Sequence, residues 1–91
     1  MIVNIAGIEF DNVLYDREAD VLYLAVGASR AADEFDASPE GHYLRYDEHG
    51  SLLGITIVNA RRILEREGKV TITLPERQVE ATDLGDVLAA A

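Results

Sequence analysis

The sequence contains no cysteine, only eight basic residues and no long apolar run. The absence of cysteine excludes a disulfide framework, a thiolate nucleophile and a zinc–thiolate site. A membrane span needs roughly 20 consecutive apolar residues, and no segment of the sequence approaches that length. The apolar first residues also lack the basic stretch that opens a signal peptide. We therefore expect a protein of a reducing compartment, the cytoplasm, with no membrane partner.

Acidic residues outnumber basic residues by 17 to 8, which gives a net charge of −9. Such a charge repels phosphate backbones and attracts basic protein surfaces. Four of the basic residues nevertheless lie within 61–69: Arg61, Arg62, Arg66 and Lys69. Because no aromatic stacking platform accompanies them, this basic cluster is better explained as a solvated helix face with Arg61 paired to Glu65. We expect no binding of nucleic acid.

The chain is short, since its 91 residues fall below the roughly 100 to 200 that one domain usually contains. We predict a single domain over residues 1–91. A domain of this size buries about 60 to 65% of the surface of its unfolded chain, which leaves its stability marginal. Association between copies buries more surface, so the length favours a homodimer.

Alternating apolar and polar residues predict an α+β fold: a small antiparallel β-sheet made of hairpins, with one short helix packed on a face. Gly50 suits the turn of the second hairpin because glycine adopts a positive φ without steric cost. Pro75 ends the last strand, and the polar stretch 27–41 is expected to be an exposed connection. The predicted strands are 12–15, 21–26, 42–46, 51–58 and 69–74.

The short helix is predicted at 60–67, where good helix formers follow one another. Asn59 before it is a favourable N-cap residue, and Gly68 after it is a favourable C-terminal residue. Ile63 and Leu64 are its large apolar side chains, so we expect the helix to pack on the sheet along a narrow seam.

Two sets of apolar residues are candidate contacts with a second copy. One side of the 21–26 strand forms an apolar stripe that so small a sheet has little to cover. The tail at 82–91 has the apolar spacing of a short amphipathic helix. Alternatively, the N-terminal segment 2–10 folds back over the stripe within one chain. The candidate residues are Val21, Tyr23 and Ala25 in the stripe and Leu84, Val87 and Leu88 in the tail.

Three carboxylates in the first hairpin turn resemble the start of a calcium-binding loop. Asp16, Glu18 and Asp20 have the required alternate spacing. The positions of that loop that need glycine and glutamate hold Val21 and Gly27 instead. We therefore predict no metal site, and we expect the carboxylates of both hairpin turns to cap the turns by accepting backbone N–H groups.

The sequence contains two histidines, His42 and His49, and either would need converging partners for catalysis or metal binding. His49 lies in a turn, where a solvated side chain is expected. The motifs of the familiar hydrolases, nucleotide-binding proteins and zinc proteases are absent from the sequence, so we predict no catalytic residue and no cofactor. The alternative is a polar site built from the two turns and the histidines: Asp16, Asp20, His42, Asp47 and His49.

Two segments carry a family resemblance. Residues 15–24 read YDREADVLYL, and residues 46–60 read YDEHGSLLGITIVNA. Together they resemble the family called domain of unknown function 2283, and the resemblance covers about residues 13–64. The predicted strand and tail at 69–91 lie outside it.

The resemblance implies a small β-sheet domain with a helix and no established enzymatic activity. It also implies a setting beside small toxin-like ribonuclease domains, and hence an antitoxin-like role. An anionic protein is suited to cover the cationic surface of such a partner. We therefore expect a non-catalytic interaction domain that forms a homodimer and neutralises a basic ribonuclease-type protein. The alternative is a small-molecule-binding domain or an enzyme of unknown reaction, recognisable by a pocket with converging polar groups.

Overall fold

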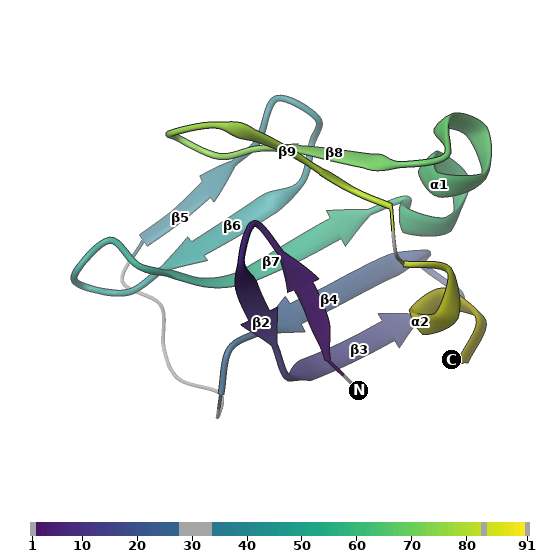
Figure 1. Cartoon of the computed structure of the whole chain (residues 1–91), viewed down its shortest axis with the longest axis horizontal. Coiled ribbons are helices and arrows are strands. Elements are labelled where there is room, and N and C mark those ends of the chain that lie inside the picture. The colour runs from purple at the N-terminus through teal and green to yellow at the C-terminus, as the bar shows by residue number, and fades with distance from the viewer. Residues whose placement is uncertain (1, 28–33, 83, 91) are drawn as a thin grey trace.

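The computed structural model describes residues 2–27, 34–82 and 84–90, within which antiparallel hairpins dominate (Figure 1). The elements are β1 (Val3–Ile5), β2 (Ile8–Phe10), β3 (Asn12–Asp16), β4 (Val21–Ala25), β5 (Glu34–Ala37), β6 (Tyr43–Tyr46), β7 (Leu52–Val58), α1 (Ala60–Glu67), β8 (Val70–Thr73), β9 (Gln78–Ala81) and α2 (Gly85–Ala90).

Five of the strands form one antiparallel sheet in the order β3-β4-β7-β6-β5. The first predicted hairpin is β3–β4, in which Asp16 pairs with Val21 across the turn. The second is β6–β7, in which Tyr46 pairs with Leu52. Gly50 in the second turn has a φ of 78°, the positive value that the sequence predicted. The predicted α+β fold is confirmed.

One face of the five-stranded sheet carries the hydrophobic core. Period-two alternation directs four central side chains to this face, and each is at most 2% exposed: Leu22, Leu24, Ile55 and Ile57. The hairpins β1–β2 and β8–β9 and the helix α2 cover it (Figure 1). Complete burial of one such side chain contributes about 1.5 to 3 kcal/mol, so this face supplies much of the folding free energy.

The helix α1 packs against the core through the two predicted residues, Ile63 and Leu64, which are partly buried. It ends at Gly68, whose φ is 75° and whose N–H donates to the Leu64 carbonyl at 2.8 Å. Asn59 occupies the N-cap position, as the sequence predicted, and its backbone carbonyl accepts the N–H of Ile63 at 2.9 Å. Asn59 has φ 59° and ψ 39°, and its side chain makes no capping hydrogen bond. The cap comes from Asp20.

Four strands lie where the sequence pattern did not predict them, and one of these is β9, which follows Pro75 and pairs with β8. Residues 34–37 of the expected connection form β5 at the edge of the sheet, and all four residues are exposed; residues 28–33 of that connection lie outside the described part. The N-terminal segment 2–10 forms the hairpin β1–β2. Its buried side chains join the core, so it covers the opposite face from the Tyr23 stripe.

Candidate functional site

The second face of the five-stranded sheet is exposed. Cross-strand register places one residue from each of four strands in a row across it: Leu14, Tyr23, Thr56 and Tyr43. Leu14 is 63% exposed, Tyr23 43% and Tyr43 54%. Phe35 on the edge strand is 71% exposed and pairs with Arg45 in the adjoining row. We call this surface the open face, formed by Leu14, Tyr23, Ala25, Phe35, Tyr43, Arg45, Gly54 and Thr56.

Gly54 allows Arg45 to lie across the middle of the open face. A Cβ atom at Gly54 would stand 2.6 Å from Arg45 Nη2 and 2.7 Å from the carbonyl oxygen of Leu24. Both distances are shorter than any tolerable contact, so only glycine leaves room for the guanidinium group over β7. Beside it lies a shallow hollow of about 400 Å³ between Leu14, Tyr23 and Arg45.

The six candidate contact residues divide between the two faces of the sheet. In the stripe, Tyr23 is exposed, and Val21 and Ala25 are half-buried. The three tail residues are at most 6% exposed, because they pack into the core of their own chain: Leu84, Val87 and Leu88. These three residues therefore offer no apolar surface to a second copy, and Tyr23 is the one exposed residue among the six candidates.

Asp20 joins the first hairpin to the helix α1. Its Oδ1 accepts hydrogen bonds from Tyr15 Oη at 2.7 Å and from the N–H of Arg61 at 2.8 Å. Its Oδ2 accepts the N–H of Arg62 at 3.1 Å, and its backbone carbonyl accepts the N–H of Ala60 at 3.2 Å. These three N–H groups open the helix and have no partner within it, so Asp20 serves as the helix cap from 40 residues upstream of Ala60.

Burial raises the pKa of the Asp20 carboxyl, but the hydrogen bonds from Tyr15, Arg61 and Arg62 outweigh it, so its pKa lies below the ordinary value. Burial, followed by the hydrogen bond to Asp20, raises the pKa of Tyr15. The guanidinium carbon of Arg61 lies 5.7 Å from the centre of the Tyr15 ring. Arg61 Nη2 also donates to the Leu88 carbonyl at 2.6 Å, which links this cluster to the tail.

Asp16 and Asp47 cap their own turns. Asp16 Oδ1 accepts the N–H of Ala19 at 3.1 Å. Asp47 Oδ1 accepts the N–H groups of His49 at 2.8 Å and of Ser51 at 2.9 Å. These three hydrogen bonds are of the turn-capping kind that the sequence predicted for the turn carboxylates.

The structure does not bring the proposed polar site together. Val21 beside the first turn pairs with Val58, at the end of β7 farthest from the second turn, so the two turns lie at opposite ends of the sheet (Figure 1). His42 belongs to neither turn: it immediately precedes β6 and is buried, with 1% of its surface exposed. Among the described residues, no group of three histidine, aspartate or glutamate side chains could hold a metal ion.

His42 is a structural residue that links three segments. Its Nδ1 accepts the N–H of Val58 at 3.1 Å, and its own N–H donates to Ser38 Oγ at 3.1 Å. Its Nε2 is buried without a hydrogen-bond partner in the described part of the chain. Burial lowers the pKa of His42, and the charge of Glu40 opposes that shift. Glu40 itself accepts hydrogen bonds from Thr73 N at 2.9 Å and Thr73 Oγ1 at 2.6 Å.

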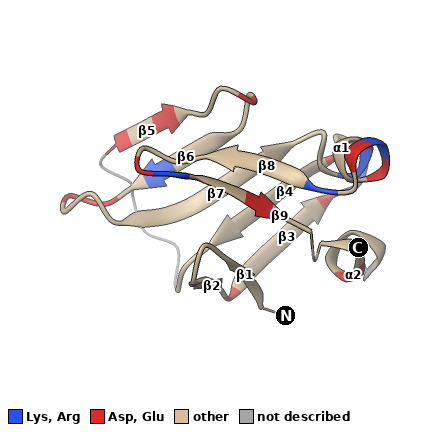
Figure 2. Ribbon diagram, turned by 45° about the horizontal axis from the view of Figure 1, so that its top comes forward, with Lys and Arg blue, Asp and Glu red and all other residues tan. Residues whose placement is uncertain are grey.

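Two of the four residues of the basic cluster, Arg66 and Lys69, pair with carboxylates of the same chain. Arg61 contacts Tyr15 and the Leu88 carbonyl rather than forming the expected pair with Glu65. Arg66 pairs with Glu67 at 2.9 Å, and Lys69 pairs with Glu80. Glu65 and Glu67 lie on α1 together with its three arginines, so the helix carries both charges (Figure 2).

Comparison with known proteins gives one match. The model of the family described as a protein of unknown function (DUF2283) matches residues 12–61, more than half of the chain. The chain belongs to this family. The matched DUF2283 segment begins at β3 and ends in the first turn of α1, so it contains the whole five-stranded sheet, the open face and the Asp20 cap. No curated protein and no solved structure matches the chain. In the described ranges, no helix has the length and apolar character to cross a membrane.

Proposed function

We propose that this protein is a non-catalytic interaction domain that forms a homodimer by packing the open faces of two copies together. The observation that supports this proposal is the row of exposed apolar side chains across β3, β4 and β6: Leu14, Tyr23 and Tyr43. Large apolar patches on small proteins are typical of contact surfaces. Tyrosine in particular is enriched at such contacts because it combines an apolar ring with a polar hydroxyl.

The distribution of charge also favours contact between two copies. The protein carries a net charge of −9, which opposes association in general. Among the strand residues that point to the open face, however, Asp16 is the one acidic residue, and it lies at the end of β3. Glu34 and Asp36 of β5 point to the other side of the sheet. The acidic residues are thus concentrated away from the open face. A two-fold dimer would bury the apolar rows and keep most of the carboxylates in water.

The energetic scale is sufficient for a stable dimer. Burial of apolar area contributes about 25 cal/mol per Å². An apolar contact of about 600 Å² therefore offers roughly 15 kcal/mol before the costs of association and ordering, which consume most of it. A dissociation constant in the micromolar range is then a reasonable expectation.

The second part of the proposal is that the dimer binds a basic protein, in the manner of an antitoxin that neutralises a ribonuclease. Its support is the net charge of −9, together with the carboxylates on surfaces that a dimer through the open face leaves free. Complementary charge speeds the encounter of two proteins and selects among partners.

Light scattering coupled to size-exclusion chromatography at tens of micromolar protein tests the dimer. The expected mass is twice the 10.0 kDa of one chain. Tyr23→Glu or Tyr43→Glu places a carboxylate in the apolar row and should yield monomer. Gln78→Glu is the matched control, because Gln78 is exposed on β9, on the opposite side of the molecule. A monomeric mass for the wild-type chain would refute the proposal, as would dimers that survive both tyrosine substitutions. Circular dichroism establishes that each variant is folded.

A further inference from the structure

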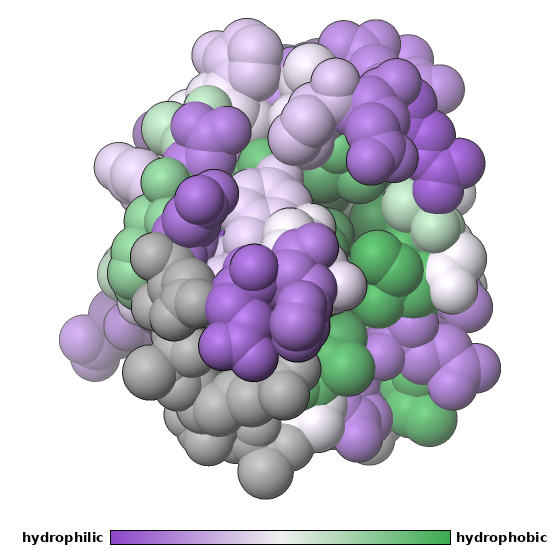
Figure 3. Space-filling view, turned by 90° about the vertical axis from the view of Figure 1, so that its left-hand side faces the viewer, coloured by the Kyte–Doolittle hydropathy of each residue, from purple (hydrophilic) through white to green (hydrophobic). Residues whose placement is uncertain are grey.

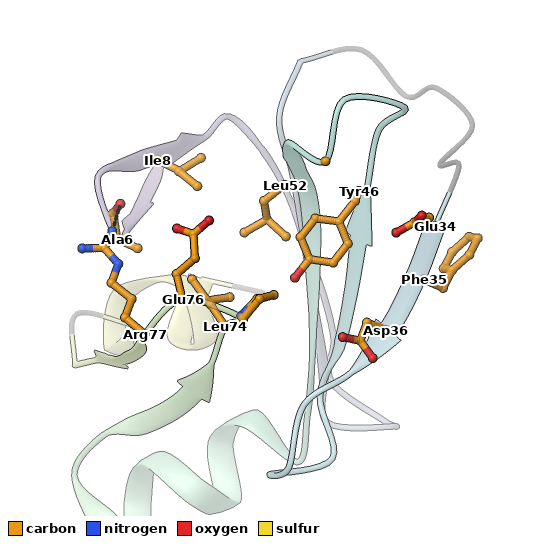
Figure 4. A pocket seen from close by; sticks show the side chains of 12 residues that line it. Ala6, Ile8, Glu34, Phe35, Asp36, Tyr46, Leu52, Leu74, Glu76 and Arg77 are labelled. Atoms are coloured by element: carbon orange, nitrogen blue, oxygen red, sulfur yellow. Dashed lines mark hydrogen bonds between the residues drawn. The ribbon is translucent and has the colours of Figure 1, made fainter.

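A cleft of about 460 Å³ opens at the end of the molecule where the β1–β2, β6–β7 and β8–β9 turns approach one another (Figure 4). It lies on the core side of the sheet, because Ile8, Leu52 and Leu74, which line it, pack against the hydrophobic core. Phe35 of the neighbouring edge strand also belongs to its lining (Figure 4). The volume falls within the range of sites that bind small organic molecules. Four separate segments of the chain line it, so no local sequence pattern could have predicted it.

Part of the lining of the cleft is apolar. Ile8 of β2, Leu52 of β7 and Leu74 after β8 are partly buried there and pack against the hydrophobic core. The ring of Tyr46 forms a further wall (Figure 4). On this side of the molecule, hydrophobic surface appears between hydrophilic side chains (Figure 3). A ligand with a flat apolar body would remove this surface from water.

Three carboxylates and one guanidinium group stand around the apolar lining. Glu34 and Asp36 belong to β5, where they pair with Tyr46 and Leu44 of β6. Glu76 belongs to the β8–β9 turn. Arg77 Nη2 in the same turn donates to the Ala6 carbonyl at 2.8 Å, so this cation is fixed at one wall. The cleft therefore carries an excess of negative charge.

Tyr46 provides an independent observation at the same place. Its hydroxyl group is buried and has no hydrogen-bond partner in the described ranges. Buried polar groups are nearly always paired, so an orphaned hydroxyl beside a cleft indicates a missing partner. Burial, followed by the negative charges of Asp36 and Glu76, raises the pKa of Tyr46. The negative charges of both carboxylates are therefore felt at this hydroxyl group.

We propose that the cleft binds a small organic cation, an ammonium group carried on a flat apolar body. The apolar body would pack between Ile8, Leu52 and Leu74, and the ammonium group would lie between Asp36 and Glu76. An ammonium group donates hydrogen bonds and accepts none, which suits a site that offers carboxylate and phenol oxygens. A neutral ligand would forgo the charge attraction, and an anionic ligand would be repelled.

Titration of the full nitrogen-15-labelled chain by NMR tests this proposal with three probes of the same shape and different charge. Tryptamine is the cation, tryptophol the neutral analogue and indole-3-propionate the anion. We expect tryptamine to shift the amides of Leu52 and Leu74 and to leave those of Tyr23 and Tyr43 unchanged. Tryptamine should bind at least about fivefold more tightly than tryptophol, and added salt should reduce the difference.

Variants locate the charge. Asp36→Asn combined with Glu76→Gln should weaken the binding of tryptamine by about fivefold or more and leave the binding of tryptophol unchanged. Glu18→Gln is the matched control, because it removes an exposed carboxylate from the opposite end of the sheet. Equal affinity for tryptamine and tryptophol would overturn the proposal. So would an unchanged affinity in the double variant, shifts confined to the open face, or no shifts at millimolar probe. None of these readouts depends on whether the chain is a dimer.

Discussion

Replacing Asp20 with glycine removes the cap of α1 without adding backbone strain. Asp20 has a φ of 57°, a region where alanine would be strained and glycine is not. The substitution leaves Tyr15 Oη and the N–H groups of Arg61 and Arg62 without their acceptor. Any loss of stability then reports on the carboxylate itself.

The expected loss is about 2 kcal/mol. Removal of a helix cap costs about 0.5 to 2 kcal/mol, and a hydrogen bond to a charged group contributes about 1.5 to 3 kcal/mol. The orphaned N–H groups are close to the surface, so water recovers part of this energy. A loss of about 2 kcal/mol lowers the melting temperature of a domain of this size by about 8 to 16 °C.

Urea unfolding followed by circular dichroism measures this loss. Glu18→Gly is the control, since Glu18 is an exposed carboxylate in the same turn. Tyr15→Phe should cost about 1 kcal/mol alone and much less in the Asp20→Gly background, because the two residues share one hydrogen bond. A loss below about 0.5 kcal/mol for Asp20→Gly, or one matched by the control, would refute the capping role.

The pH dependence gives an independent check on Asp20. The folded-state pKa of this carboxyl lies below its ordinary value, because its hydrogen bonds outweigh the effect of burial. The folded state therefore favours the ionised form, and the unfolded state binds the proton first as the pH falls. The advantage of wild type over Asp20→Gly should be full at neutral pH and should shrink below about pH 4.

Two further predictions concern His42 and Gly54. Burial lowers the pKa of His42, so the unfolded state binds a proton before the folded state does, and the free energy of unfolding should fall as pH drops through about 6.5. In urea unfolding between about pH 7.5 and 5.5, His42→Leu should abolish this slope and His49→Ala should retain it; an unchanged slope in His42→Leu would contradict the assignment. Gly54→Ala should cost about 1 to 3 kcal/mol because its methyl group meets the Leu24 carbonyl oxygen, which cannot move aside as a side chain can. Arg45→Ala should not rescue that loss; full rescue would show that the guanidinium was the sole obstacle.

The sequence predicted the elements whose pattern is local. The alternation in β7 reflects one buried face, β4 is rich in β-branched and aromatic residues, and Gly50 marks the turn before β7, so both hairpins could be placed before the structure was known. The edge strand β5 could not be predicted, because all four of its residues are exposed and no buried face distinguishes it from an exposed connection. The same holds for the helix cap. Asn59 has the right chemistry in the right place, yet Asp20 supplies the acceptor through a contact that only the folded chain creates.

The functional surfaces differ in the same way. The stripe containing Tyr23 was predictable, because an apolar residue on the second side of a strand is visible in the sequence. The exposure of Tyr43 and Leu14 in the same row depends on the register of four strands. The cleft draws Ile8, Tyr46, Leu52 and Leu74 from segments up to 66 residues apart, and it exists only because three hairpins meet there.

The cap of α1 by a distant carboxylate has a consequence for the order of folding. An isolated helix of eight residues is too short to persist in water. Here its first N–H groups find their acceptor only after the β3–β4 hairpin has formed and β7 has paired with β4, because that pairing carries Asp20 to the start of the helix. The helix should thus be a dependent element, which is stable only when the β3–β4–β7 part of the sheet is formed. The amide protons of Arg61 and Arg62 should then be protected from exchange as long as their contact with Asp20 persists, although they lie at a helix end where fraying is the rule.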